Sequence, residues 1–85
     1  MPYRVLITKK ADRQFQDIPR HLQEAVDKRI QSLGNDPRPY GSIKLRGMSG
    51  HYRVRQGDYR IIYEIDDEMK IVSVVKIGDR KDVYE

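Results

Sequence analysis

The chain has 85 residues, contains no cysteine and carries a net charge of +4, from 17 lysine and arginine residues against 13 aspartate and glutamate residues. This length suits one small domain, so residues 1–85 are predicted to form a single folding unit. The lack of cysteine excludes disulfide bonds, thiolate chemistry and cysteine zinc sites. Apolar runs are too short for a membrane span or a secretory signal, which predicts a soluble, cytoplasmic protein.

The first part of the chain predicts one strand followed by two helices. Residues 3–7 alternate and are rich in strand-forming side chains. Thr8 offers an oxygen that can cap a helix, Pro19 suits the first turn of a second helix, and Gly34 would end it. The apolar side chains at helical spacing are Ala11, Phe15 and Ile18, then Leu22, Val26, Ile30 and Leu33.

The second part of the chain predicts a sheet. The predicted strands are residues 52–56, 59–65 and 71–77, with a short extended segment at 43–45. A Gly57-Asp58 turn joins the first two of these strands. The predicted order is β-α-α-β-β-β, an α+β domain in which a helical hairpin packs on one face of a four-stranded, mostly antiparallel sheet. The place of the first strand in that sheet stays open.

Positive charge is concentrated between residues 44 and 60. Five basic residues lie there against one acid, Asp58, so this stretch carries the whole net charge of +4 and the rest of the chain is balanced. A concentrated positive field on a balanced surface favours a polyanion such as nucleic acid as the partner. The five basic residues are Lys44, Arg46, Arg53, Arg55 and Arg60.

A two-residue turn at Gly57-Asp58 would place Arg55 opposite Arg60. Alternation along the strands then sends Arg53, Arg55 and Arg60 to one face of the sheet. Like charges in opposed positions destabilise a sheet by roughly 0.2–1 kcal/mol, which favours an anionic ligand between them. The alternative is a solvated surface of splayed arginines. The opposite face would receive Tyr52, Val54, Ile61, Tyr63 and Ile65.

Other candidate site residues lie outside this hairpin. Arg80, Lys81 and Tyr84 follow the last strand, where a tail could fold back and place a phenol beside a base. His51 precedes the arginine strand and has both a structural and a functional interpretation. The acids at 66–68 lack histidine partners at metal-ligand spacing, so we expect a solvated turn and no metal site.

Several motifs together resemble the RelE family of toxin–antitoxin ribonucleases, within the RelE/ParE superfamily. The resemblance spans nearly the whole chain and includes the helical hairpin. It implies a ribosome-dependent mRNA endoribonuclease that cuts the codon in the ribosomal A site, without a metal or cofactor, by attack of the 2′-hydroxyl on the adjacent phosphate. The motifs are KLRGM at 44–48, YRVR at 52–55, GDYRIIY at 57–63, VVKIGDR at 74–80 and Val83-Tyr84.

The resemblance also implies partners. It predicts a cognate antitoxin protein, the ribosome and mRNA as partners, and no membrane. Contact with operator DNA is expected only through the antitoxin complex.

The resemblance implies site residues as well. Family active-site positions fall on Arg53, Arg55, Arg60, Arg80 and Tyr84, and RNA or ribosome contacts are expected at Lys44, Arg46 and Lys81. Well-known members of the family have lysines where this chain has Arg53 and Arg55. Because arginine does not lose its proton in proteins, neither can be the general base. The base is then Tyr84, His51, ribosomal RNA or no specific group.

Two other functions compete with this prediction. A ParE-like toxin would keep the fold and inhibit DNA gyrase without cutting nucleic acid. A non-catalytic nucleic-acid-binding module would bind with a steep salt dependence and leave mRNA uncut.

Overall fold

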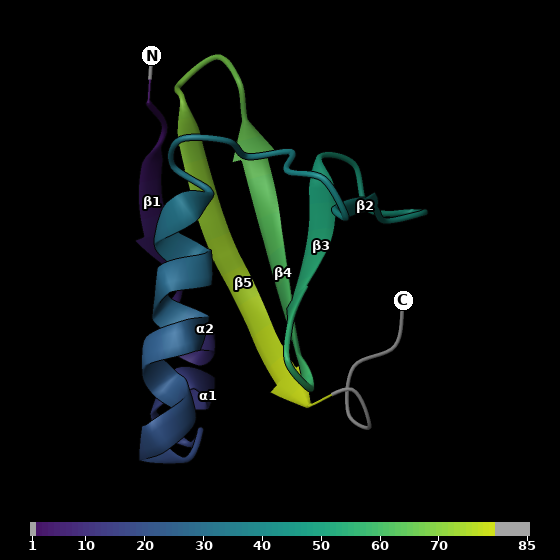
Figure 1. Cartoon of the computed structure of the whole chain (residues 1–85). Coiled ribbons are helices and arrows are strands. Elements are labelled where there is room, and N and C mark those ends of the chain that lie inside the picture. Colours follow the sequence, from purple (N-terminus) through teal and green to yellow (C-terminus); the bar gives the residue numbers. More distant parts are fainter. Residues whose placement is uncertain (1, 80–85) are drawn as a thin grey trace.

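Two helices pack on one face of a five-stranded sheet in the computed structural model, which describes residues 2–79 (Figure 1). The first half of the chain forms β1 (Arg4–Ile7), α1 (Lys9–Gln16) and α2 (Arg20–Ser32). The second half forms β2 (Ile43–Lys44), β3 (His51–Gln56), β4 (Tyr59–Asp66) and β5 (Ile71–Asp79). The predicted α+β class is confirmed.

The strand order in the sheet is β1-β5-β4-β3-β2. β1 runs parallel to β5, and the other neighbouring strands are antiparallel. The predicted count of four strands is wrong by one, because Ile43 and Lys44 pair with Arg53 and Tyr52 of β3. The resulting short strand β2 forms the edge of the sheet opposite β1 (Figure 1).

The predicted start of α1 is confirmed in detail. The Thr8 hydroxyl oxygen accepts a hydrogen bond from the Ala11 backbone N–H at 3.1 Å, which satisfies a donor that the first turn of a helix leaves without an intrahelical partner. Pro19 lies at the N-cap of α2, one residue before the first turn in which the sequence analysis expects it, and it makes no side-chain capping bond.

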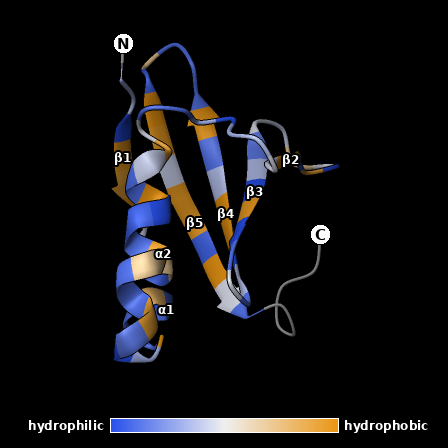
Figure 2. Cartoon of the chain, in the orientation of Figure 1, coloured by the Kyte–Doolittle hydropathy of each residue, from blue (hydrophilic) through white to orange (hydrophobic). Residues whose placement is uncertain are grey.

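The main core lies between the helices and the sheet. Apolar residues recur along β4 and β5 and on the helices (Figure 2). Leu22 departs from the prediction, since 38% of it is exposed. Residues four apart in a helix drift by about 40° around its axis, so two such steps from Ile30 carry Leu22 to the rim of the apolar stripe. The buried core residues are Ala11, Ile18, Val26, Ile30, Leu33, Val54, Ile61, Tyr63, Ile65, Val72, Val74 and Ile77.

Gly34 follows the end of α2, as predicted, but the close packing around it also requires a residue without a side chain. A Cβ atom on Gly34 would lie 3.0 Å from the Tyr3 carbonyl oxygen and 3.2 Å from Val5 Cγ2. The Tyr3 N–H also donates to the Gly34 carbonyl oxygen at 2.7 Å. The absent side chain thus lets β1 approach the end of α2.

A bulge changes the facing of side chains along β5. Ile62 lies opposite Lys76, whereas Tyr63 lies opposite Val74, so one residue of β5 is extra. Because of this insertion, Val74 and Ile77 are both buried in the core although they are three positions apart. The register then places Lys76 on the other face of the sheet, which we call the outer face because it points away from the helices.

Candidate functional site

The β3–β4 hairpin has the register that the sequence predicts. Arg55 lies opposite Arg60, and Gln56 lies opposite Tyr59 across the Gly57-Asp58 turn. The hairpin side chains predicted to reach the core do so, and Tyr59, which was not predicted, packs against it as well. Arg53, Arg55 and Arg60 therefore share the outer face.

The three arginines differ in exposure. Arg55 is exposed and Arg60 is partly buried. Arg53 departs from the prediction of an open guanidinium, because only 5% of it is exposed. It lies between Ile43 of β2 and Ile62 of β4, beside a small second cluster of apolar residues. Arg55 and Arg60 are thus the more accessible pair, and Arg53 lies deeper in the same face.

Lys76 is a fourth cation of the outer face that the sequence analysis did not select. The register places it opposite Ile62, one position from Arg60 along the outer face of the sheet. In the sequence, Lys76 is a lone charge inside a strand of β-branched residues. The sequence alone could not predict which face of the sheet its side chain occupies, because the bulge decides that.

The remaining predicted cations lie elsewhere. Lys44 lies opposite Tyr52, so it shares a face with Tyr52 rather than with the three arginines. Arg46 is exposed in the β2–β3 connection, where residues 44–49 line an open hollow of about 500 Å³. Arg80, Lys81 and Tyr84 lie outside the described residues.

His51 lies on the outer face, opposite Glu64. Its Nδ1 lies 2.9 Å from the Ser49 carbonyl oxygen, which can only accept a hydrogen bond. In the neutral ring the proton is therefore on Nδ1, and Nε2 is the acceptor. This arrangement leaves Nε2 as the accepting nitrogen of the neutral ring, two positions along β3 from Arg53.

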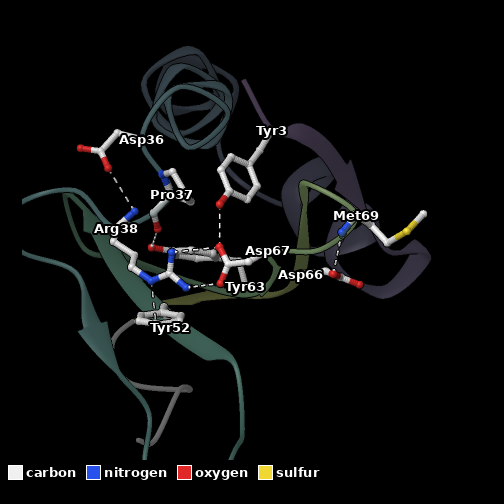
Figure 3. A network of polar contacts seen from close by, with 9 residues as sticks. All are labelled: Tyr3, Asp36, Pro37, Arg38, Tyr52, Tyr63, Asp66, Asp67 and Met69. Atoms are coloured by element: carbon white, nitrogen blue, oxygen red, sulfur yellow. Dashed lines mark hydrogen bonds and ion pairs between the residues drawn. The ribbon is translucent and has the colours of Figure 1, made fainter. Parts of the chain in front are cut away.

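A polar network at the opposite end of the sheet from the Gly57-Asp58 turn was missed by the sequence analysis (Figure 3). The Arg38 guanidinium donates to both carboxylate oxygens of Asp67, at 3.2 and 2.7 Å, and to the Tyr52 hydroxyl at 3.2 Å. The Tyr3 hydroxyl donates to Asp67 at 2.5 Å. These bonds lower the pKa of Asp67 to about 2 and raise that of Arg38. The network ties the residue before β1, the α2–β2 loop, β3 and the β4–β5 turn together.

Tyr63 anchors the same loop from inside the core. Its hydroxyl donates to the Pro37 carbonyl oxygen at 2.7 Å, and its ring stacks on Tyr52 with centroids 6.1 Å apart. Burial raises the pKa of Tyr63 to about 12. The loop that leads to β2 is therefore fixed by a buried phenol and by the exposed Arg38–Asp67 ion pair.

The described part of the chain offers no obvious metal site, because no three His, Asp or Glu side chains among residues 2–79 gather in ligating positions. Neither of its two helices has the length and apolar character to span a membrane. The outer face carries concentrated positive charge from Arg53, Arg55, Arg60 and Lys76. Guanidiniums on two paired strands can bind a phosphate and stabilise charge that develops on it.

Comparison with known proteins matches nearly the whole sequence to toxins. The model of the ParE toxin of the type II toxin–antitoxin system parDE matches residues 5–84. Toxin RelG of Mycobacterium tuberculosis is 34% identical over 85 residues, which cover 99% of this chain and 98% of that protein. The mRNA interferase toxin RelE of Escherichia coli K12 is 28% identical over 88 residues, covering 99% of this chain and 92% of that protein.

The fold is likewise similar to that of a solved toxin. The archaeal RelE in the crystal structure of the RelE–RelB complex from Pyrococcus horikoshii superposes with a TM-score of 0.83 at 31% identity. The superposition covers 98% of this chain and 100% of that one. The likeness therefore includes the sheet, the helical hairpin and the strands that carry the arginines.

Proposed function

This chain belongs to the RelE family of type II toxins, and we propose that it is an endoribonuclease that cuts mRNA in the ribosomal A site. The proposal includes a cognate antitoxin as inhibitor and the cytoplasm as the place of action. It takes support from the relative named an mRNA interferase and from the relatives solved in complex with the antitoxin RelB.

One observation carries the proposal, and it is the opposition of Arg55 and Arg60 on the outer face. A phosphodiester that lies between two guanidiniums on neighbouring strands accepts hydrogen bonds from both forks. The pair is therefore suited to a phosphate, and the strand pairing fixes its geometry before the ligand arrives.

The proposed reaction is an in-line displacement at phosphorus. The 2′-oxygen forms a bond to the adjacent phosphorus, and the bond from phosphorus to the 5′-oxygen breaks. The 2′-hydroxyl loses its proton and the leaving 5′-oxygen gains one. The products are a 2′,3′-cyclic phosphate and a 5′-hydroxyl, and no metal or cofactor takes part.

The roles of the residues follow from charge and position. Arg55 and Arg60 hold the scissile phosphate and stabilise the extra negative charge of the transition state, for which one preorganised donor contributes roughly 3 kcal/mol. Arg53, nearly buried, supports the outer face beside them and directs the RNA backbone. Arg80 is assigned to the leaving oxygen and Tyr84 to stacking or proton transfer, although both lie outside the described residues.

The general base has four candidates: Tyr84, His51, ribosomal RNA, or no specific group. The hydrogen bond from His51 Nδ1 to Ser49 favours the tautomer that accepts a proton at Nε2. His51 lies four residues from Arg55 along β3. That separation argues against a role as base at the phosphate held by Arg55 and Arg60, and for a contact with a neighbouring nucleotide.

Primer extension on mRNA from translating ribosomes tests this function. The wild-type chain should produce breaks within codons, while Arg60→Ala and Arg80→Ala should produce none and should no longer arrest growth. Circular dichroism must show that both variants stay folded. Folded variants that still arrest growth would contradict the assigned roles, and uncut mRNA with the wild type would contradict the function.

A second candidate is a gyrase inhibitor, and the match to the ParE toxin model favours it. Such a toxin would use the same fold without cleaving RNA. A supercoiling assay with purified gyrase separates the two, because only the second candidate predicts inhibition.

A further inference from the structure

The outer face of the sheet contains an amine among its guanidiniums. Its three arginines keep their protons in proteins, whereas the ammonium group of a lysine can give a proton to a substrate. Of the lysines in the described part of the chain, only Lys76 lies on the outer face, since Lys44 belongs to the opposite face and the others lie in the helices or in the β4–β5 turn. Lys76 therefore adds to this face a chemistry that the arginines lack.

The strand register brings Lys76 beside Arg60. The residue directly opposite Arg60 on β5 is Gly78, which has no side chain, and Lys76 lies two positions from Gly78 on the same face. Lys76 is thus a diagonal neighbour of Arg60. Such neighbours in an antiparallel pair lie about 7–8 Å apart, within reach of long side chains. A phosphate held by Arg55 and Arg60 therefore lies within reach of the Lys76 ammonium group.

The surroundings of Lys76 leave its ammonium group available to a ligand. Within residues 2–79, Lys76 forms no ion pair with a carboxylate. The residue opposite Lys76 is Ile62, which is 5% exposed and forms a small apolar cluster with Leu45. Val75, the neighbour of Lys76 in β5, packs against that cluster. These apolar side chains accept no hydrogen bond, so the three N–H donors of the ammonium group remain for an oxygen of the substrate.

The proposed reaction needs a proton donor that the arginines cannot supply. The 5′-oxygen gains a proton when its bond to phosphorus breaks. Arg80, which is assigned to that oxygen, can stabilise negative charge on it but cannot give up a proton. A lysine ammonium group can do both, and proton transfer by a positioned side chain typically accelerates a reaction by about 100- to 10,000-fold.

We propose that Lys76 is a further catalytic residue, the general acid that gives its proton to the leaving 5′-oxygen. The inference rests on the proposed function, because it adds a role to the same reaction on the same face. As the 2′-oxygen bonds to phosphorus and the bond to the 5′-oxygen breaks, a proton moves from Lys76 Nζ to the 5′-oxygen. The proton of the 2′-hydroxyl leaves separately, to the base or to water. The neutral amine regains a proton from water after the product leaves.

Lys76→Arg tests the proton transfer, because it keeps the positive charge and removes the transferable proton. On ribosomes that carry an ordinary mRNA, this variant should cleave at least about 100-fold more slowly than the wild type. Lys28→Arg is the matched control and should cleave like the wild type, since Lys28 is an exposed lysine of α2, on the other side of the sheet. Cleavage of the ordinary mRNA by Lys76→Arg at the wild-type rate would overturn the proposal, because positive charge alone would then suffice.

An mRNA with sulfur in place of the leaving 5′-oxygen gives the second arm of the test. Because a thiol is a much stronger acid than an alcohol, sulfur leaves as a thiolate without a proton. Lys76→Arg should therefore cleave this mRNA at the wild-type rate, whereas Arg60→Ala should stay inactive on both mRNAs, because it has lost a donor to the charge at phosphorus.

Two failures are distinguishable in this experiment. A Lys76→Arg variant that is equally slow on both mRNAs, while the wild type cleaves both, would overturn the inference alone and give Lys76 a structural or binding role. A wild-type protein that leaves the ordinary mRNA uncut would contradict the proposed function, and the inference with it.

Discussion

Arg55 and Arg60 occupy directly opposed positions on β3 and β4, with their side chains on the same, outer face of the sheet. We predict that Arg55→Gln leaves the fold intact and raises the free energy of unfolding by up to about 1 kcal/mol, because it removes a like-charge repulsion. The same change should reduce cleavage on ribosomes by at least about 100-fold, because one donor to the transition state is lost.

Urea denaturation and the primer-extension assay measure the two effects on the same preparation. Arg4→Gln is the control, since Arg4 is an exposed arginine on the far edge of the sheet. A destabilised Arg55→Gln variant would mean that Arg55 serves the fold rather than the ligand.

The parts of this architecture that sequence reasoning could reach are local ones. The Gly57-Asp58 turn fixes the register of two strands that follow each other directly, so the opposition of Arg55 and Arg60 needs only a turn and a period of two. The Thr8 cap and the Pro19 start likewise depend on residues within one helical turn.

The parts of the architecture that sequence reasoning could not reach depend on pairings between residues far apart in the chain. Arg38 and Asp67 are 29 residues apart, and each alone is an ordinary exposed charge. The direction of Lys76 depends on a one-residue bulge that no periodicity reveals, and the face of Lys44 depends on the pairing of a two-residue strand. Long-range register therefore decides which members of a basic stretch act together.

The Arg38–Asp67 ion pair predicts a stability change at acidic pH. The pKa of Asp67 is lowered to about 2 by its bonds with Arg38 and Tyr3, against 3.8 ordinarily. Because the folded pKa lies below the unfolded one, this stabilisation is present above about pH 4 and is lost as the pH falls towards 2. Asp67→Asn should be less stable than the wild type at pH 7, and the difference should shrink over that interval.

Urea denaturation at several pH values checks this, with Glu68→Gln as an exposed control in the same turn. Because both partners are exposed, added salt should also reduce the difference. A difference in the free energy of unfolding between the wild type and Asp67→Asn that persists below pH 2 would exclude the ion pair as its source.

The buried phenol of Tyr63 gives the opposite pH dependence. Tyr63→Phe should lower the free energy of unfolding at pH 7 by roughly 1–3 kcal/mol, because the Pro37 carbonyl oxygen loses its donor. The pKa of Tyr63 is raised by burial to about 12 from 10. The wild type should therefore lose stability between about pH 10 and 12, and its advantage over the variant should narrow there.

Thermal or urea unfolding from pH 7 to about 12 measures that narrowing. Tyr40→Phe is the matched control, since it removes the same hydroxyl from a fully exposed ring and should leave stability unchanged. Equal losses of stability from Tyr40→Phe and Tyr63→Phe would contradict the role of the buried hydrogen bond.

Gly34 sets how closely β1 approaches α2, and Gly34→Ala should destabilise the fold by about 1–3 kcal/mol. The new methyl group would lie 3.0 Å from the Tyr3 carbonyl oxygen, which belongs to the backbone, and 3.2 Å from Val5 Cγ2. Shortening the side chain with Val5→Ala should therefore not restore stability, because the tighter contact is with the backbone. Urea denaturation of the single and double variants measures this, with Asn35→Ala, at the next and exposed position, as the control. Full rescue by Val5→Ala would place the constraint in side-chain packing instead of in the contact between the main chain at Tyr3, just before β1, and the end of α2.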